Sequence, residues 1–287
     1  MSDAPPPKPR RQGLIGYWWA PVALIAVVLA VMAYLHPYQP LMLSDVPPEV
    51  VSSAAALDKN FGERVNRTFK YAIRRSYASP SGVMQVEIRS TLQPLENGLV
   101  MRQDDWYDIK GRSVVYQERY ILFRNLFSVH TRSREVAPLV HDLMGRVGWY
   151  NDSARTIASQ LTGSTPDAPD WKLDMVMARA SDTDGKGLTV QTTNYQRKVH
   201  CERTGNLDAA DIGAVAKGSY PRISCLSTSN DQQAERRSEY VWLPQHGIFL
   251  LLAYRQKGEN MTTPTDNPGE LAVKGNLLSF ESLPLSD

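Results

Sequence analysis

Ile248-Phe249-Leu250-Leu251-Leu252-Ala253 is an uninterrupted run of apolar residues. Successive side chains of a β-strand point to opposite faces, so a strand formed here is apolar on both faces. Such a strand belongs in the middle of a sheet that is covered on both sides. We expect helices on one side and, on the other, a further layer, a partner or a bound apolar molecule.

Further strands surround this run in the C-terminal third of the chain. The turn-like segment 244–247 (PQHG) precedes it, and similar breaks separate strands expected at 222–230, 238–243, 248–256 and 271–280. Because consecutive strands joined by short turns pair antiparallel, this region predicts an antiparallel sheet.

The preceding part of the chain adds more strands. Apolar and polar residues alternate over 84–89, and Asn97-Gly98 is a pair favoured in hairpin turns. The β-forming residues of 113–132 predict one long bent strand or two shorter ones. Strands are also expected over 171–177 and 188–201, followed by a loop over 204–221.

Three segments show helical patterns. Phe61, Val65, Phe69 and Ile73 recur at every fourth position, as on one face of a helix. An apolar stripe from Val136 to Val147 predicts a clear amphipathic helix, and a short helix is expected over 153–161. The predicted fold class is therefore α+β, in which a mainly antiparallel, curved sheet packs against one or two helices.

A hydrophobic segment near the N-terminus predicts one transmembrane helix before this domain. Residues 14–35 (LIGYWWAPVALIAVVLAVMAYL) form 22 residues without a charge, long enough to span a bilayer. Trp18, Trp19 and Tyr34 lie near its ends, where aromatic rings prefer the headgroup layer. Basic residues precede the segment, and none occurs in the 20 residues after it. The positive-inside rule then places the N-terminus in the cytoplasm and the C-terminal domain outside, in the periplasm of a bacterial inner-membrane protein.

Two further features of this segment concern its cleavage and its packing. Val31-Met32-Ala33 also fits a signal-peptidase site, so cleavage after Ala33 competes with retention as an anchor. Gly16, Ala20 and Ala23 share one helix face, which permits close helix packing, although alanine is common in such helices.

The expected layout has four parts. Residues 1–13 form a proline-rich basic cytoplasmic tail, 14–35 the transmembrane helix, 36–48 a proline-rich spacer, and 49–287 the extracytoplasmic α+β domain.

The two cysteines, Cys201 and Cys225, are consistent with export of the C-terminal domain. Both lie in the domain expected outside, and an even pair in an oxidising compartment predicts one disulfide. The simplest role for this bridge is to pin the ends of the loop between them.

Composition and motifs exclude several functions. The whole chain has a formal charge of +2, all of it supplied by the first 35 residues, so the domain lacks the basic surface that nucleic-acid binding needs. The specific signatures of hydrolases, kinases, nucleotide-binding loops and zinc sites are absent from the sequence. We therefore assign no catalytic residue, metal ligand or cofactor, and expect a protein that is not an enzyme.

The plan of a short tail, one helix, a proline spacer and an exported domain is similar to that of bitopic scaffold subunits of bacterial secretion and conjugation machines. This resemblance is one of plan and assigns no site residue. It implies a non-enzymatic scaffold or interaction subunit whose partners are the lipid bilayer and other envelope proteins or a second copy of itself. The alternative is a membrane-anchored binding module that holds an apolar ligand, a lipid or a peptide, on the curved sheet. A third hypothesis is an anchored hydrolase.

Overall fold

The computed structural model divides the chain into two compact units, residues 1–40 and 41–287, which are described separately. It describes residues 19–35, 41–61, 65–79, 82–107, 114–135, 150–162, 165–185, 189–213, 217–230, 235–257 and 270–284.

The first unit contains one helix, α1 (Trp19–Leu35), of 17 residues. It lies within the segment predicted to cross the membrane, and large apolar side chains over residues 19–28, among them Trp19 and Leu24, are exposed. Among the described residues, no helix reaches both the length and the apolarity that a membrane crossing requires. The membrane-spanning role of residues 14–35 therefore stays a prediction.

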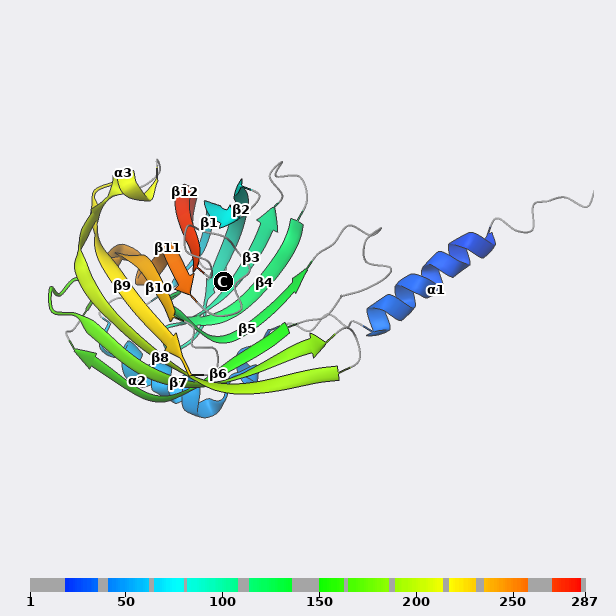
Figure 1. Ribbon diagram of the computed structural model, residues 1–287, viewed down its shortest axis with the longest axis horizontal. Coiled ribbons are helices and arrows are strands. Elements are labelled where there is room, and N and C mark those ends of the chain that lie inside the picture. Colours follow the sequence, from blue (N-terminus) through cyan, green and yellow to red (C-terminus); the bar gives the residue numbers. More distant parts are fainter. Residues whose placement is uncertain are drawn as a thin grey trace, which may run out of the picture. The chain divides into compact units, whose positions relative to one another are not determined.

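The second unit is built on an antiparallel sheet that closes into a barrel (Figure 1). Each strand pairs with its neighbours in the sequence, and β1 pairs with β12 to complete the ring. The strands described are β1 (Arg67–Ser79), β2 (Gly82–Pro94), β3 (Leu99–Tyr107), β4 (Val114–Phe123), β5 (Phe127–Glu135), β6 (Tyr150–Thr162), β7 (Lys172–Gly185), β8 (Thr189–Asp208), β9 (Ser219–Ser229), β10 (Glu235–Leu243), β11 (Ile248–Lys257) and β12 (Glu270–Pro284). The predicted antiparallel sheet is confirmed, and with so few helices the unit is mainly β.

Two tight turns use left-handed backbone conformations. Asn97 and Gly98, between β2 and β3, have φ values of 59° and 70°. Positive φ at both central residues matches the twist of antiparallel strands, so the predicted Asn-Gly turn is confirmed. Arg124 and Asn125, between β4 and β5, repeat this geometry with φ values of 45° and 61°. The segment 113–132 therefore forms two shorter strands.

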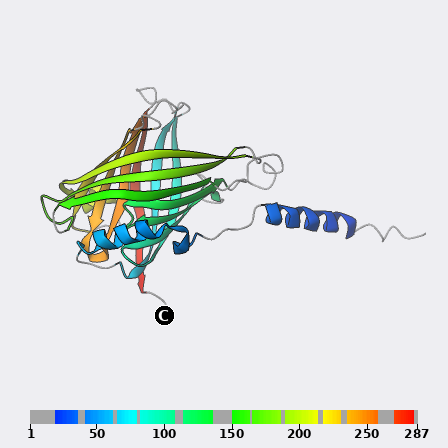
Figure 2. The same cartoon turned by 90° about the horizontal axis from the view of Figure 1, so that it is seen from below.

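Helix α2 (Pro48–Asp58) packs against the barrel (Figure 2). It begins with a proline at its first position, where the missing N–H is not needed. Its buried side chains Val50, Ala54 and Leu57 join one apolar cluster with barrel residues, including Phe123, Trp242 and Phe249 of the strands and Trp171 just before β7. Leu41 and Val46, in the segment expected to be a spacer, are buried in the same cluster. The compact unit accordingly begins at Leu41.

Strand β11 is buried on both faces, as its sequence predicts. Phe249 and Leu251 belong to the apolar cluster that includes α2. Ile248, Leu250 and Leu252 belong to a second cluster, formed with residues of β1 and β2. The helix therefore contributes to one side and other strands of the barrel cover the other.

Two predicted helices are wrong. Residues 153–161 lie in β6, which pairs with β7 along its length, so sheet pairing overrides the local helical pattern. The stripe from Phe61 to Ile73 enters β1, where Phe69 and Ile73 share one face. A spacing of four residues is a multiple of the strand period of two, so the pattern fits either structure. The predicted helix from Val136 to Val147 lies outside the described residues.

The segment between the cysteines also differs from the expectation. The sequence predicts a loop over 204–221, but β8 continues to Asp208 and a short helix, α3 (Ala209–Ile212), follows. Strand β9 then begins at Ser219. Regular structure therefore occupies much of this segment.

Candidate functional site: an arginine-lined cavity

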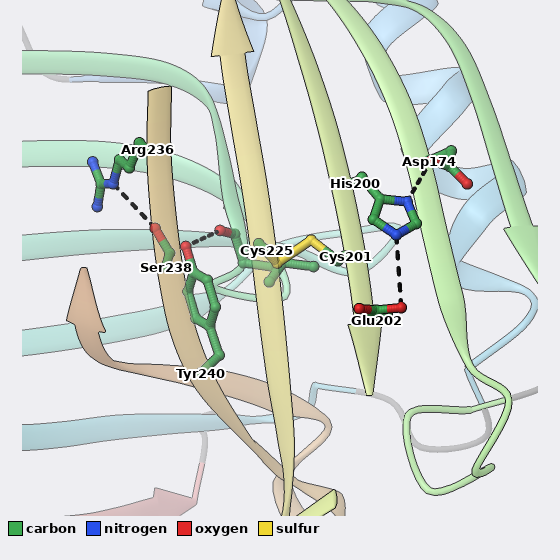
Figure 3. Close-up of a disulfide and its surroundings, with 9 residues drawn as sticks. Asp174, His200, Cys201, Glu202, Cys225, Arg236, Ser238 and Tyr240 are labelled. Carbon is green, nitrogen blue, oxygen red and sulfur yellow. Dashed lines mark hydrogen bonds and ion pairs between the residues drawn. A yellow bond between two sulfur atoms is a disulfide. The ribbon is translucent and has the colours of Figure 1, made fainter. Parts of the chain in front are cut away.

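The disulfide between Cys201 and Cys225 links directly opposite residues of β8 and β9 (Figure 3). The predicted pairing is confirmed, with a Cα–Cα distance of 4.0 Å. The bridge ties two neighbouring strands together, rather than pinning the ends of a loop. Both cysteines also line a cavity between the strands.

This cavity has a volume of about 210 Å³. It is smaller than the roughly 300–1,000 Å³ of pockets that hold drug-sized ligands, so it suits a compact ligand. Tyr120, Tyr240, Tyr254 and Trp106 line it together with aliphatic residues of several strands. Its charged lining consists of one glutamate and five arginines, namely Glu118, Arg75, Arg102, Arg179, Arg197 and Arg236.

Arg102 is held in place by neighbours on three sides. Its Nη2 lies 3.1 Å from Asp104 Oδ2, and its Nη1 donates to Asn125 Oδ1 at 2.7 Å. The guanidinium also stacks 4.4 Å from the centre of the Tyr120 ring. Burial opposes the charged form, but Asp104 and neighbouring groups raise the pKa of Arg102 above its ordinary value. This cation is therefore permanent and rigidly positioned.

Two other arginines of the lining donate hydrogen bonds to hydroxyl or backbone oxygens. Arg179 is buried and donates to the Ser128 carbonyl at 3.0 Å and to its Oγ at 3.1 Å. Arg236 donates from Nε to Ser238 Oγ at 3.1 Å (Figure 3). Its guanidinium also lies 4.1 Å from the centre of the Tyr254 ring. These contacts hold each guanidinium in a fixed orientation.

Arg75 is another buried cation of the lining. It is only 8% exposed, on the same face of β1 as the buried residues Ile73 and Tyr77. Within the described chain, no carboxylate lies at ion-pair distance from it. Burial opposes its charge, whereas Tyr77 and Asp104 act in the other direction, and the net effect raises the pKa of Arg75.

Glu118 is the one acidic side chain among the described residues that line the cavity. It accepts a hydrogen bond from Trp106 Nε1 at 3.0 Å. Burial, followed by repulsion from Asp104, raises the pKa of Glu118 above its ordinary value, although Tyr120, Arg102 and Arg75 oppose this shift. Burial likewise raises the pKa of the Tyr120 hydroxyl, so this group stays protonated at neutral pH.

Among the described residues that line the cavity, arginines outnumber carboxylates. The nearby carboxylate of Asp104 is paired with Arg102. A buried charge is costly unless it is paired and hydrogen-bonded. An anion bound here would add to the compensation of these charges.

A separate polar group lies on the outer face of β7 and β8 (Figure 3). His200 Nδ1 lies 2.6 Å from Asp174 Oδ1, and its Nε2 lies 3.8 Å from Glu202 Oε2. All three side chains are about half exposed. Across the described ranges, no group of three or more His, Cys, Asp and Glu side chains is placed to hold a metal.

The residues singled out from the sequence fall into two groups. Trp19, Ala20, Ala23 and Tyr34 lie in α1, whereas Gly16 and Trp18 lie outside the described residues. The two cysteines lie in the barrel and line the cavity. The structure thus brings Cys201 and Cys225 together at the candidate site, and the helix residues belong to the other unit.

The arginines of the cavity were not predicted from the sequence. The alternation of side chains along a strand could have predicted the position of one of them. Arg75 lies two residues after Ile73 and therefore shares the buried face of Phe69, Tyr71 and Ile73. An arginine in the inward phase of a strand is unusual, because arginine is rarely buried unless it is paired.

No family model matches this chain, and comparisons with curated proteins and with solved structures also find no match.

Proposed function

We propose that this protein is an exported, membrane-anchored binding module that holds a small ligand inside its barrel. The observation that carries this proposal is the cavity of about 210 Å³ lined by aromatic, aliphatic and arginine side chains. Binding sites typically combine an apolar wall with a few well-placed polar groups.

Packing considerations support a binding role. Protein interiors are close-packed, and spaces of this size between side chains are few in any domain. A barrel selected for stability alone would fill the space with apolar side chains rather than place Arg75 and Arg102 beside it. Burying these charges costs free energy, and a ligand that binds to them would account for their presence.

The proposed location rests on the N-terminal unit and the disulfide. Helix α1 exposes large apolar side chains such as Trp19 (69%) and Leu24 (66%), which a bilayer would cover. A disulfide is stable in an oxidising compartment. We therefore assign the barrel to the periplasm and residues 14–35 to the inner membrane, with the N-terminus in the cytoplasm. Protease treatment of spheroplasts should digest a C-terminal epitope on the full chain. Protection of that epitope would contradict this topology.

Ligand retention tests the binding function. The full chain is purified in lipid nanodiscs, extracted with organic solvent, and compared with protein-free nanodiscs by mass spectrometry. We expect a small molecule to be enriched with the protein. Ser227→Trp places a large ring in the cavity and should remove this enrichment. The matched control is Ser224→Trp on the same strand, at a position absent from the cavity lining, and it should retain the ligand. Equal extracts from protein and empty nanodiscs would overturn the proposal.

The exposed surface of α1 favours a second candidate, a scaffold or interaction subunit of an envelope complex. Besides lipid, a transmembrane helix of a partner or of a second copy would cover these side chains, and Ala20 and Ala23 would permit close approach. Cross-linking of the tagged full chain in native membranes tests this candidate. Stoichiometric recovery of other envelope proteins would favour it, whereas recovery of the chain alone would oppose it.

A further inference from the structure

Two arginines at the cavity, Arg75 and Arg236, form no close ion pair with a described carboxylate. Arg75 is nine-tenths buried and lines the cavity. Arg236 is fixed by Ser238 on one side and by the Tyr254 ring on the other. The Tyr254 ring lines the same cavity as both Arg75 and Arg236. A guanidinium held over an aromatic ring presents its remaining N–H groups in a fixed orientation suited to an oxyanion.

The cavity wall also includes apolar side chains. Leu122 and Leu251 are among the residues that line it. In four strands, an inward apolar residue stands two positions from an inward arginine. These pairs are Ile73 and Arg75, Val100 and Arg102, Met177 and Arg179, and Val199 and Arg197. Each of these strands therefore gives the inner face both an apolar and a cationic side chain.

We propose that the ligand is an amphiphilic anion, whose oxyanion group binds Arg75 and Arg236 and whose apolar part extends toward Leu122 and Leu251. This inference rests on the ligand-binding function proposed above and names the chemical class of the ligand. A carboxylate and a phosphate monoester share the required chemistry, because both accept bidentate hydrogen bonds from a guanidinium. The small volume favours a short apolar part.

Titration calorimetry with three eight-carbon probes tests this assignment. Octanoate and octyl phosphate carry the two anionic groups, and 1-octanol has the same chain without charge. Each is titrated into the full chain in nanodiscs, and the heat of protein-free nanodiscs is subtracted. We expect at least one anion to bind with 1:1 stoichiometry and at least tenfold more tightly than 1-octanol. The stronger of the two anions distinguishes a carboxylate ligand from a phosphate ligand.

Substitutions locate the binding site. Arg75→Met and Arg236→Met should each weaken binding of the anion at least tenfold and leave binding of 1-octanol unchanged. The matched control is Arg222→Met, because Arg222 lies on β9, makes an ion pair with Glu239 and is absent from the cavity lining. It should leave the affinity for the anion unchanged. The melting temperature of each variant verifies that it is folded.

The outcomes separate this inference from the function on which it rests. Equal affinity for octanoate, octyl phosphate and 1-octanol, all lost in Ser227→Trp, would refute the anionic ligand and retain the binding module. Anion binding that is unchanged in folded Arg75→Met and Arg236→Met would also refute the assignment. Failure of all three probes to bind, together with the absence of an extracted ligand, would refute both.

Discussion

The guanidinium of Arg124 makes an ion pair with the carboxylate of Asp58, with 2.7 Å between Nη2 and Oδ1. Arg124 is fully buried in the turn between β4 and β5, and Asp58 is the last residue of α2. The same guanidinium donates to the Gly247 carbonyl at 2.8 Å and stacks on Phe61. One side chain therefore connects the helix, the turn and the residue that precedes β11.

Asp58→Asn should destabilise the fold by about 3 kcal/mol, because it leaves the Arg124 charge buried without its partner. Urea denaturation of the full chain measures this difference. The matched control is Glu239→Gln, which breaks an ion pair of the same 2.7 Å length with Arg222 at an exposed position. Exposed pairs contribute little, so we expect a loss of at most about 1 kcal/mol there. Similar losses in both variants would contradict the structural role of the Arg124 pair.

Gly98→Ala should destabilise the fold more than Gly218→Ala. Both glycines have positive φ, 70° and 90°, so each substitution costs roughly 1–2 kcal/mol of backbone strain. A Cβ at position 98 would also collide with Asp58 Oδ1, whereas position 218 has open space around it. We expect Gly98→Ala to cost at least about 1 kcal/mol more than its control in the same denaturation experiment. Equal losses would show that Asp58 moves aside freely.

Removal of the disulfide with Cys201→Ala and Cys225→Ala should lower the melting temperature. The bridge joins residues separated by 24 positions, and closing such a loop stabilises the native state by about 3 kcal/mol. For a unit of this size, that corresponds to a decrease of about 10 °C. Ligand binding at low temperature should remain, because strand pairing between β8 and β9 continues on both sides of the bridge. An unchanged melting temperature in oxidising buffer would contradict a stabilising role.

Glu118→Gln should raise stability at pH 7, and this gain should shrink as the pH falls. The folded-state pKa of Glu118 is raised above its unfolded value. The folded protein therefore binds a proton more readily than the unfolded chain, and wild-type stability increases as Glu118 becomes protonated. The change should occur from the raised pKa down to about 4.3, the ordinary pKa of glutamate.

Urea denaturation at several pH values measures this effect, with Glu239→Gln as the exposed control. The charged and titratable groups facing Glu118 are Asp104, Arg102, Arg75 and Tyr120, and all are retained in the variant. A stability difference between Glu118→Gln and wild type that stays constant from pH 7 to pH 4 would refute the raised pKa.

Local sequence patterns predicted an element correctly where the spacing of apolar residues fitted only a strand or only a helix. The apolar run at the start of β11, the Asn97-Gly98 turn and the strands of the C-terminal third all follow from alternation and turn chemistry. The pairing of two cysteines in an exported domain also needed no tertiary information. The patterns failed where a spacing of four residues suited both a helix and a strand, as from Phe61 to Ile73.

The sequence by itself determined the antiparallel pairing, the doubly buried strand and the disulfide, because alternation, short turns and cysteine parity are local or compositional properties. Only the tertiary structure decided that the sheet closes into a barrel, since the pairing of β1 with β12 joins segments about 200 residues apart. Closure also created the candidate site. Arg75, Arg102 and Arg236 are distant in the sequence, and only the strand register brings their charges around one cavity.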